Sequence, residues 1–386
     1  MQVFFITANY DTFNNPTLNG VFHLLEKNNI TVYLFCPPQR KNFSSTFKNI
    51  KKKNITILPN RRRNKIKYLV NYLIFELYLL RTTLIVICKR PNRIIGIDPV
   101  GIVYANNIYR KVSYIFKNLK LDYFSFEIFF KDEGADKIAE IAACKNISNL
   151  IVQDETREKL IKEENKISDK VVIHQIPVAP IIEFDKNRGQ ESFRVKHNVP
   201  FESRLLLNFG SFNEWTGSEI VFNLLDKGLP ELWILVIHST FPLLPSINEK
   251  LLKYNKKRLQ VVLSTDYIKT YQDVYYYIKQ FNCGLALYIP GKTIYTGRNL
   301  YHIGLSSGKI SSYILSEIPI IMSDLPFFRM LNEKFNFGHI VNSADNIYKC
   351  LKKFDSTEMR NMPSKELQEL VDPKIKLNDY IVGLKM

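Results

Sequence analysis

The segment from Gly304 to Asp324, GLSSGKISSYILSEIPIIMSD, indicates the fold class because it contains a loop, a helix and a strand in immediate succession. The run Ser306-Ser307-Gly308 can present backbone N–H groups at a helix N-terminus, where the helix dipole favours an anion. Lys309 adds a positive charge in the first turn, and residues 318–322 then have the composition of a strand. The arrangement suits the diphosphate of a nucleotide. A plain serine-capped helix with a solvated lysine has the same sequence.

Outside this segment, short apolar runs alternate with helical patterns, which is typical of parallel sheets covered by helices on both faces. In the first half we expect strands at 3–7, 31–35, 55–58, 84–88, 94–97, 121–125, 150–153 and 171–176, and helices at 20–27, 65–81, 99–119, 136–143 and 155–164. In the second half we expect strands at 204–208, 233–238, 259–263, 283–287, 318–322 and 339–341, and helices at 218–225, 246–254, 271–280, 309–316, 326–332 and 344–354.

A proline-containing stretch at 176–180, followed by a charged segment at 185–196, marks a domain boundary. We therefore expect an N-terminal domain over 1–180 and a C-terminal domain over 181–366, each a Rossmann-like α/β unit. Open α/β sheets bind ligands at the carboxyl ends of their strands. The cleft that two such domains face is the expected site.

The composition excludes several classes of protein. A chain of 386 residues with 46% hydrophobic content can bury large cores and is not a small disulfide-stapled module. The five cysteines are odd in number and form no CxxC pair, which argues for a reducing compartment and against a zinc site, so we expect no metal. The N-terminus resembles a first strand rather than a signal peptide. Charges interrupt the apolar stretch 68–88, so we do not expect it to span a membrane.

The formal net charge of +17 is concentrated between residues 40 and 67, in Lys51–Lys53 and Arg61–Arg63. Such a cluster attracts an anionic membrane or a nucleic acid, and a lysine-rich solvated face would have the same composition. The adjacent helix 65–81 carries aromatic residues that suit docking on a bilayer, although a buried helix would also carry them; they are Tyr68, Tyr72, Phe75 and Tyr78.

In motif order, the second half resembles the donor-binding domain of GT-B glycosyltransferases, and is similar to glycosyltransferase family 4. The stretch Leu205–Ser211 resembles the family's strand that ends at a glycine turn, and Asp273–Tyr288 resembles its helix followed by a strand that ends in a Tyr-Pro loop. The positions that complete the match are Asn299, Ser306 to Lys309, Tyr313 and Pro319 to Ile321.

The resemblance implies a GT-B architecture with a C-terminal helix, at about 367–386, that crosses back to the first domain. The expected donor-binding residues are Gly210, Ser211, His238, Arg298, Asn299, Ser306, Ser307, Gly308 and Lys309. The chain departs from the family where Ser211 and Thr216 replace two diphosphate-binding cations, so Lys309, with Lys292 or Arg298, would supply that charge. Two family carboxylates are also replaced, by Gly304 and Ser312. Trp215 would cover a base or sugar or pack in the core, and His238 could instead be a hydrogen-bonded residue at a strand end.

The first half resembles the acceptor side of such enzymes more weakly. Asn9, Asn19 and Gly20 would lie at the cleft, where a glycine lets a ligand approach the backbone. Glu127 and Asp11 are the expected catalytic carboxylates. In the alternative explanation, Glu127 forms a salt bridge at a strand end and Asp11, like Asp154, caps a turn or a helix.

The activity implied by the resemblance is transfer of a sugar from a nucleotide-sugar, a UDP-sugar, to a cell-surface glycan (capsule or lipopolysaccharide) or a lipid-linked oligosaccharide. It would proceed with retention and without metal or cofactor. A sugar-nucleotide epimerase of the same fold, a non-catalytic basic protein that binds nucleic acid or a membrane surface, and a catalytically silent relative stay open. Because recognised nucleic-acid modules are absent, we expect no nucleic-acid partner. We expect a cytoplasmic location, with possible attachment to the inner face of the cell membrane.

Overall fold

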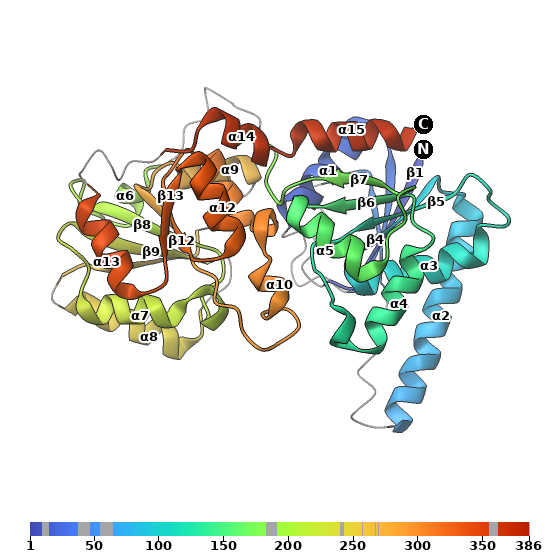
Figure 1. The fold of residues 1–386 in the computed structure, drawn as a ribbon, viewed down its shortest axis with the longest axis horizontal. Coiled ribbons are helices and arrows are strands. Elements are labelled where there is room, and N and C mark those ends of the chain that lie inside the picture. Colours follow the sequence, from blue (N-terminus) through green and yellow to red (C-terminus); the bar gives the residue numbers. More distant parts are fainter. Residues whose placement is uncertain are drawn as a thin grey trace. The chain divides into compact units, whose positions relative to one another are not determined.

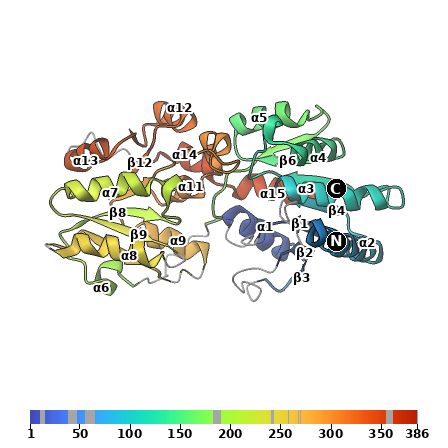
Figure 2. The ribbon, with the colours of Figure 1, turned by 90° about the horizontal axis from the view of Figure 1, so that it is seen from below.

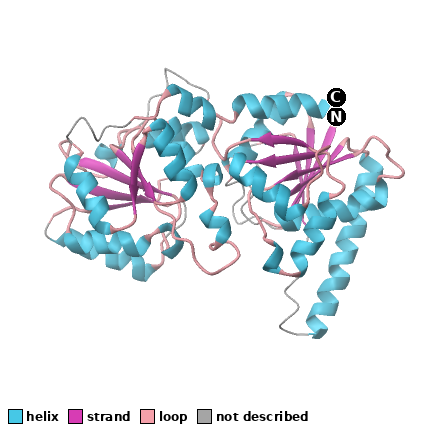
Figure 3. Ribbon diagram, in the orientation of Figure 1, coloured by secondary structure: helices cyan, strands magenta, loops and turns pink. Residues whose placement is uncertain are grey.

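The structure is a computed structural model that describes residues 1–9, 15–37, 47–54, 65–182, 191–239, 243–256, 258–266, 268, 270–354 and 362–385. The chain divides into two compact units: the first is Met1–Pro177 with Pro373–Met386, and the second is Val178–Asp372. Each unit is a parallel sheet flanked by helices, with the strands in magenta in Figure 3 and a second view in Figure 2.

The first unit contains a seven-stranded parallel sheet in the order β3-β2-β1-β4-β5-β6-β7. The strands are β1 (Gln2–Thr7), β2 (Thr31–Cys36), β3 (Ile50–Asn54), β4 (Arg93–Ile97), β5 (Lys120–Phe124), β6 (Asn149–Val152) and β7 (Val172–Gln175). The helices are α1 (Pro16–Lys27), α2 (Lys65–Lys89), α3 (Asp98–Val112), α4 (Ala135–Cys144), α5 (Glu155–Asn165) and α15 (Lys374–Lys385). Helices α1 and α15 pack together on one face, and α2, α3 and α4 form a row on the other (Figure 1).

The second unit contains a six-stranded parallel sheet in the order β10-β9-β8-β11-β12-β13. Its strands are β8 (Arg204–Phe209), β9 (Trp233–His238), β10 (Val261–Ser264), β11 (Cys283–Ala286), β12 (Ile320–Ser323) and β13 (Gly338–Val341). Its helices are α6 (Phe193–Lys196), α7 (Ser218–Lys227), α8 (Pro245–Leu252), α9 (Tyr271–Ile278), α10 (Arg298–Tyr301), α11 (Gly308–Leu315), α12 (Pro326–Phe335), α13 (Ala344–Lys353) and α14 (Lys365–Val371).

Both sheets have the doubly wound arrangement, since the strand order reverses beside the first strand of each unit. The reversal lies between β1 and β4 in the first unit and between β8 and β11 in the second. Buried side chains cover both faces of the second sheet: α9, α11 and α14 contribute to one core, and α7, α8 and α13 to the other. The expected fold class, two tandem Rossmann-like α/β domains, is confirmed.

One predicted strand of the first unit is wrong, and one predicted helix begins earlier than expected. Residues 84–88, expected as a strand, form the end of α2, because a short apolar run cannot be told from a buried helical segment by its pattern alone. Thr82 and Thr83 extend the helix through this region, and their hydroxyls donate to the carbonyls of Tyr78 and Leu79. The predicted helix 20–27 begins earlier, at Pro16, because the Asn15 side chain caps it. The predicted strand 55–58 lies outside the described residues.

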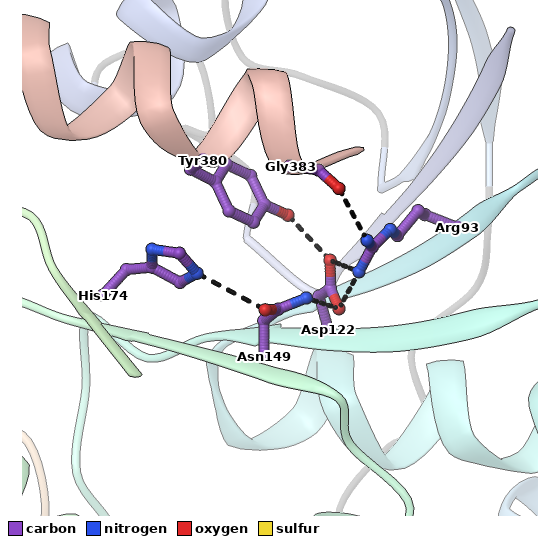
Figure 4. Close-up of polar contacts among 6 residues, drawn as sticks. All are labelled: Arg93, Asp122, Asn149, His174, Tyr380 and Gly383. Atoms are coloured by element: carbon purple, nitrogen blue, oxygen red, sulfur yellow. Dashed lines mark hydrogen bonds and ion pairs between the residues drawn. The ribbon is translucent and has the colours of Figure 1, made fainter. Parts of the chain in front are cut away.

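A buried carboxylate joins the C-terminal helix α15 to the first sheet (Figure 4). Asp122 on β5 is fully buried and accepts hydrogen bonds from Arg93 on β4, at 3.0 and 3.1 Å, and from the Asn149 amide at 2.7 Å. From α15, the Tyr380 hydroxyl donates to Asp122 at 2.9 Å, and the Gly383 carbonyl accepts from Arg93 at 3.0 Å. A helix distant in sequence thus completes the partners of a buried ion pair.

We expect the stability of the first unit to depend on this network. Tyr380→Phe removes a donor to a buried charge and should reduce the free energy of unfolding by about 1.5–3 kcal/mol. Arg93→Met leaves the carboxylate uncompensated and should cost about 3–5 kcal/mol. Urea unfolding followed by circular dichroism measures both. Tyr114→Phe, at an exposed tyrosine of the same unit, is the matched control; a Tyr380→Phe variant as stable as this control would contradict the assignment.

Candidate functional site

In the second unit, the carboxyl ends of β8 and β11 separate around one tyrosine side chain. The strands pair only at Leu206 with Cys283 and at Leu207 with Gly284. Beyond these pairs, the N–H of Phe209 donates to the Tyr313 hydroxyl at 3.0 Å, and that hydroxyl donates to the Leu207 carbonyl at 2.8 Å. A Cβ on Gly284 would lie 2.5 Å from the Tyr313 ring, so only glycine leaves room for it. Tyr313 therefore holds the strands apart where α/β sheets bind ligands.

Helix α11 begins at this point with Ser307 as its N-cap. The Ser307 hydroxyl accepts from the Ile310 N–H at 3.2 Å and lies 2.5 Å from the Tyr288 hydroxyl. The N–H groups of Ser306 and Ser307 donate to carbonyls of the preceding turn, so they are not free for a ligand, contrary to expectation. Gly308 and Lys309 belong to the first helical turn, where the helix supplies no acceptor for backbone N–H groups.

Lys309 places its ammonium group between the two strands. Its Nζ donates to Asn208 Oδ1 at 3.1 Å and lies 5.9 Å from the centre of the Tyr288 ring. In the described part of the chain Lys309 forms no salt bridge, and burial lowers its pKa to about 7. The neighbouring amide nitrogen of Asn208 is buried and has no hydrogen-bond partner among the described residues. An anion bound here would stabilise the charged form of the lysine.

His238 has the role of a packed residue at a strand end. Its ring stacks on Phe209 with the centroids 5.0 Å apart, and its Nδ1 lies 3.1 Å from the Ser264 hydroxyl. Burial lowers the pKa of His238 to about 4, so the ring is neutral near pH 7 and cannot neutralise a phosphate. This contact pattern is the one expected in the alternative explanation of His238, whereas its Nε2 is buried without a hydrogen-bond partner among the described residues, so its role in donor binding stays a prediction.

The other predicted donor-side residues differ in their exposure to solvent. Gly210 ends β8 with a φ of 93°, in the left-handed region that favours glycine, and Ser211 after it is exposed. Arg298 is exposed and Asn299 is buried at the start of α10. The Trp215 ring stacks on Tyr288 with centroids 6.5 Å apart and is half-buried.

The Thr216 side chain is engaged within its own turn. Its hydroxyl bonds to Asn213, forming a capping box, and the side chain is buried. A ligand could therefore not use it without opening that turn.

In the first unit, charged groups gather after the ends of β4, β5 and β6. One Asp98 carboxylate oxygen accepts the N–H groups of Phe126 and Glu127 at 2.9 and 3.1 Å. The buried Arg157 guanidinium donates to the Phe126 carbonyl at 2.6 Å and interacts electrostatically with Glu127, Asp154 and Asp98. The predicted carboxylate Glu127 thus lies in a loop held by a second carboxylate and by an arginine.

Sequence reasoning did not identify Asp98. Burial first, and then the charge of Glu127, raise the pKa of Asp98 to about 7. Its φ of 61° is rare for a residue with a Cβ, and such strain persists only where the surroundings hold it. The only signal in the sequence is an Asp-Pro pair directly after a strand.

The remaining acceptor-side predictions have mixed outcomes. Asn9 is exposed just after β1, while Asp11 lies outside the described residues. Asn19 and Gly20 were expected at a helix start but lie within α1, and Gly20 is buried. The expected position of Asn19 and Gly20 at a helix start is therefore wrong, and their role on the acceptor side stays a prediction. Asp154 caps α5 by accepting from the Arg157 N–H at 2.9 Å.

The described residues contain no cluster of His, Cys, Asp or Glu side chains suited to a metal ion. None of the described helices is long and apolar enough to cross a membrane.

Comparison with known proteins adds a likeness of fold. No family model and no curated protein matches the chain. Among solved structures, it is similar to sucrose-phosphate synthase from Thermosynechococcus elongatus, with a TM-score of 0.68, 12% identity, and coverage of 100% of this chain and 99% of that one. It is similar to Anabaena HepE in complex with UDP, with a TM-score of 0.67, 11% identity, and 99% of each chain covered. It is also similar to a protein described as a UDP-N-acetylglucosamine 2-epimerase from Listeria monocytogenes, with a TM-score of 0.63, 11% identity, and coverage of 100% and 95%. The chain therefore has the GT-B fold.

Two substitutions at Asp98 separate its hydrogen bonds from its charge. Asp98→Asn keeps an oxygen acceptor and tolerates the left-handed backbone, so it should be at least as stable as the wild type at about pH 8. Asp98→Ala loses both N–H partners and should cost about 1–3 kcal/mol. Urea unfolding of both variants tests this.

The same pair of variants predicts a pH dependence. Because the folded pKa of Asp98 is raised above its unfolded value, the folded state binds more protons between about pH 4 and 7. The stability of the wild type relative to Asp98→Asn should therefore fall as the pH rises through this range. A constant difference would contradict the raised pKa.

Proposed function

We propose that this protein is a glycosyltransferase of the family 4 type that transfers a sugar from a UDP-sugar. The observation that supports this most directly is Lys309, a half-buried cation without a salt bridge among the described residues, in the first turn of α11 at the strand reversal of the second sheet. A diphosphate is the group such a site suits, because the ammonium and the first-turn N–H groups offer positive charge together. Solved structures of similar fold contain UDP or UDP-glucose, which favours uridine as the base.

In the proposed reaction, the bond between the sugar and the β-phosphate oxygen breaks, and the leaving diphosphate gains negative charge. Lys309 and the N–H groups of Gly308 and Lys309 would stabilise that charge, which is mainly an electrostatic and positioning task. Gly210 leaves the backbone open to the nucleotide, and Trp215 over Tyr288 would cover its base or sugar. Ser211, Arg298 and Asn299 complete the proposed donor side.

On the acceptor side, we propose that Glu127 receives or orients the proton of the attacking hydroxyl group, with Asn9 and Asp11 near the acceptor. The acceptor would be a cell-surface glycan or a lipid-linked oligosaccharide, and the enzyme would act without a metal, with retention, at the inner face of the membrane. These finer points rest on the resemblance to family 4.

An epimerase acting on a UDP-sugar is the second candidate, because one protein of similar fold is described as such an enzyme. The two activities differ in what they release. An epimerase converts the UDP-sugar without any acceptor, whereas a transferase releases UDP in proportion to the glycosylated acceptor formed. Nuclear magnetic resonance of a UDP-sugar incubated with the protein alone distinguishes them.

Nucleotide binding tests the site directly. By isothermal titration calorimetry, UDP should bind more tightly than GDP or CMP, and Lys309→Met should weaken UDP binding at least tenfold. Lys352→Met, at an exposed lysine on α13 of the same unit, is the matched control and should bind UDP normally. If none of the three nucleotides binds at millimolar concentration, the proposal is wrong.

The lowered pKa of Lys309 adds a pH signature. Above about pH 7 the free lysine is mostly neutral, so binding the diphosphate must add a proton to it. UDP affinity should therefore fall between about pH 8 and 9, by up to tenfold. Calorimetry in buffers of different ionisation enthalpy should show uptake of about one proton at pH 8, absent in Lys309→Met. Proton uptake that is unchanged in the variant would rule out Lys309 as the group that titrates.

A further inference from the structure

Helix α2 carries a line of exposed leucines. Leu73, Leu77, Leu80 and Leu84 are 57%, 65%, 53% and 53% exposed. Their spacing of four, three and four residues places them on one face of the helix. The other side of the helix faces the protein, since Leu79, Thr83 and Val86 are buried.

This leucine face is more than the scattered apolar exposure of an ordinary surface. Single exposed leucines are common in folded proteins, whereas a contiguous apolar patch marks an interaction site. The sequence continues the same spacing at Ile66 and Val70, so the pattern runs from the first turn of the helix. In Figure 1 these first turns extend beyond the helices packed beside α2.

The charges next to the leucine face are mostly basic. Arg81 is exposed between Leu80 and Leu84, and Lys89 and Arg90 are exposed at the end of the helix. Lys51 is exposed on the strand that precedes α2 in the chain. An anionic surface would therefore gain favourable electrostatic contacts beside the apolar ones.

We propose that the leucine face of α2 docks on the surface of an anionic phospholipid bilayer. The leucines enter the boundary between headgroups and acyl chains, and Arg81, next to the leucine face, reaches the phosphates, as in interfacial amphipathic helices. This inference names the surface that holds the protein at a membrane, and it stands independently of the UDP-sugar activity.

A second copy of the chain is the other occupant to consider, because the same leucine spacing is that of a coiled-coil seam. Two observations favour the bilayer. A stable protein interface uses about 20–30 residues a side, far more than four leucines supply. Pairing two copies would also bring together two chains of net charge +17.

The residues differ from those that the sequence suggested for docking. The side chains of Tyr68, Tyr72 and Phe75 lie outside the described part of the structure, and Tyr78 is half-buried. The exposed face is therefore made by leucines.

Vesicle flotation of the full chain tests the proposal. The protein should bind vesicles of phosphatidylcholine with phosphatidylglycerol at low ionic strength, bind pure phosphatidylcholine less, and lose affinity as salt is added. The double variant Leu73→Ser with Leu77→Ser should bind anionic vesicles at least tenfold more weakly. Leu244→Ser with Leu252→Ser, at exposed leucines of the second unit, is the matched control and should bind normally.

The outcomes distinguish the alternatives. No flotation at low ionic strength, or equal binding by both double variants, overturns the proposal. The proposal is also overturned if light scattering shows that the wild type is a dimer and the Leu73→Ser, Leu77→Ser variant is a monomer. The leucine face would then be a dimer interface. The same variant should bind UDP like the wild type. A loss of vesicle binding can therefore be distinguished from a loss of nucleotide binding. Arg81→Gln should lower the affinity for anionic vesicles and leave that for phosphatidylcholine unchanged.

Discussion

The hydrogen bonds and the ion pair of the buried Asp122 carboxylate are the interactions on which the first unit depends. Removing a charge from water costs free energy unless the charge is paired and hydrogen-bonded in the protein. The partners of Asp122 come from β4, β6 and α15. Tyr380 donates to Asp122 and the Gly383 carbonyl accepts from Arg93, so these two buried side chains have all their hydrogen-bond partners only when α15 is in place. The unit is thereby assembled from both ends of the chain.

Tyr313 has a comparable structural role in the second unit, because it provides hydrogen-bond partners for buried groups of the sheet. Its hydroxyl takes over the hydrogen bonds of β8 where pairing with β11 stops, so the strands can separate without leaving buried polar groups unsatisfied. Lys309 lies one helical turn from this tyrosine on the same helix. The polar groups that would bind a diphosphate are therefore positioned by the packing of α11 against the sheet.

Much of this could be predicted from local patterns, and most of the misses come from contacts between segments that are distant in the sequence. The alternation of strands and helices, the start of α11 and the presence of Lys309 there are local properties of the sequence. The partners of Lys309 and Asp98 are not, because Asn208 and the Glu127 loop come from other strands. The strand predicted at 84–88 failed for a similar reason: whether an apolar run is a strand or a helix depends on what it packs against. Gly20 was misplaced because Asn15 caps the helix earlier than expected.

The tie between α15 and Asp122 has a consequence for how the protein is made. During synthesis on a ribosome, the whole of the second unit is translated before α15 emerges, while the first sheet waits with Arg93 and Asp122 lacking two of their partners. A chain that stops short of α15 would expose an apolar and charged seam that chaperones and proteases can recognise. Arg93 and Asp122 thus obtain their full set of partners only after the second unit has been translated.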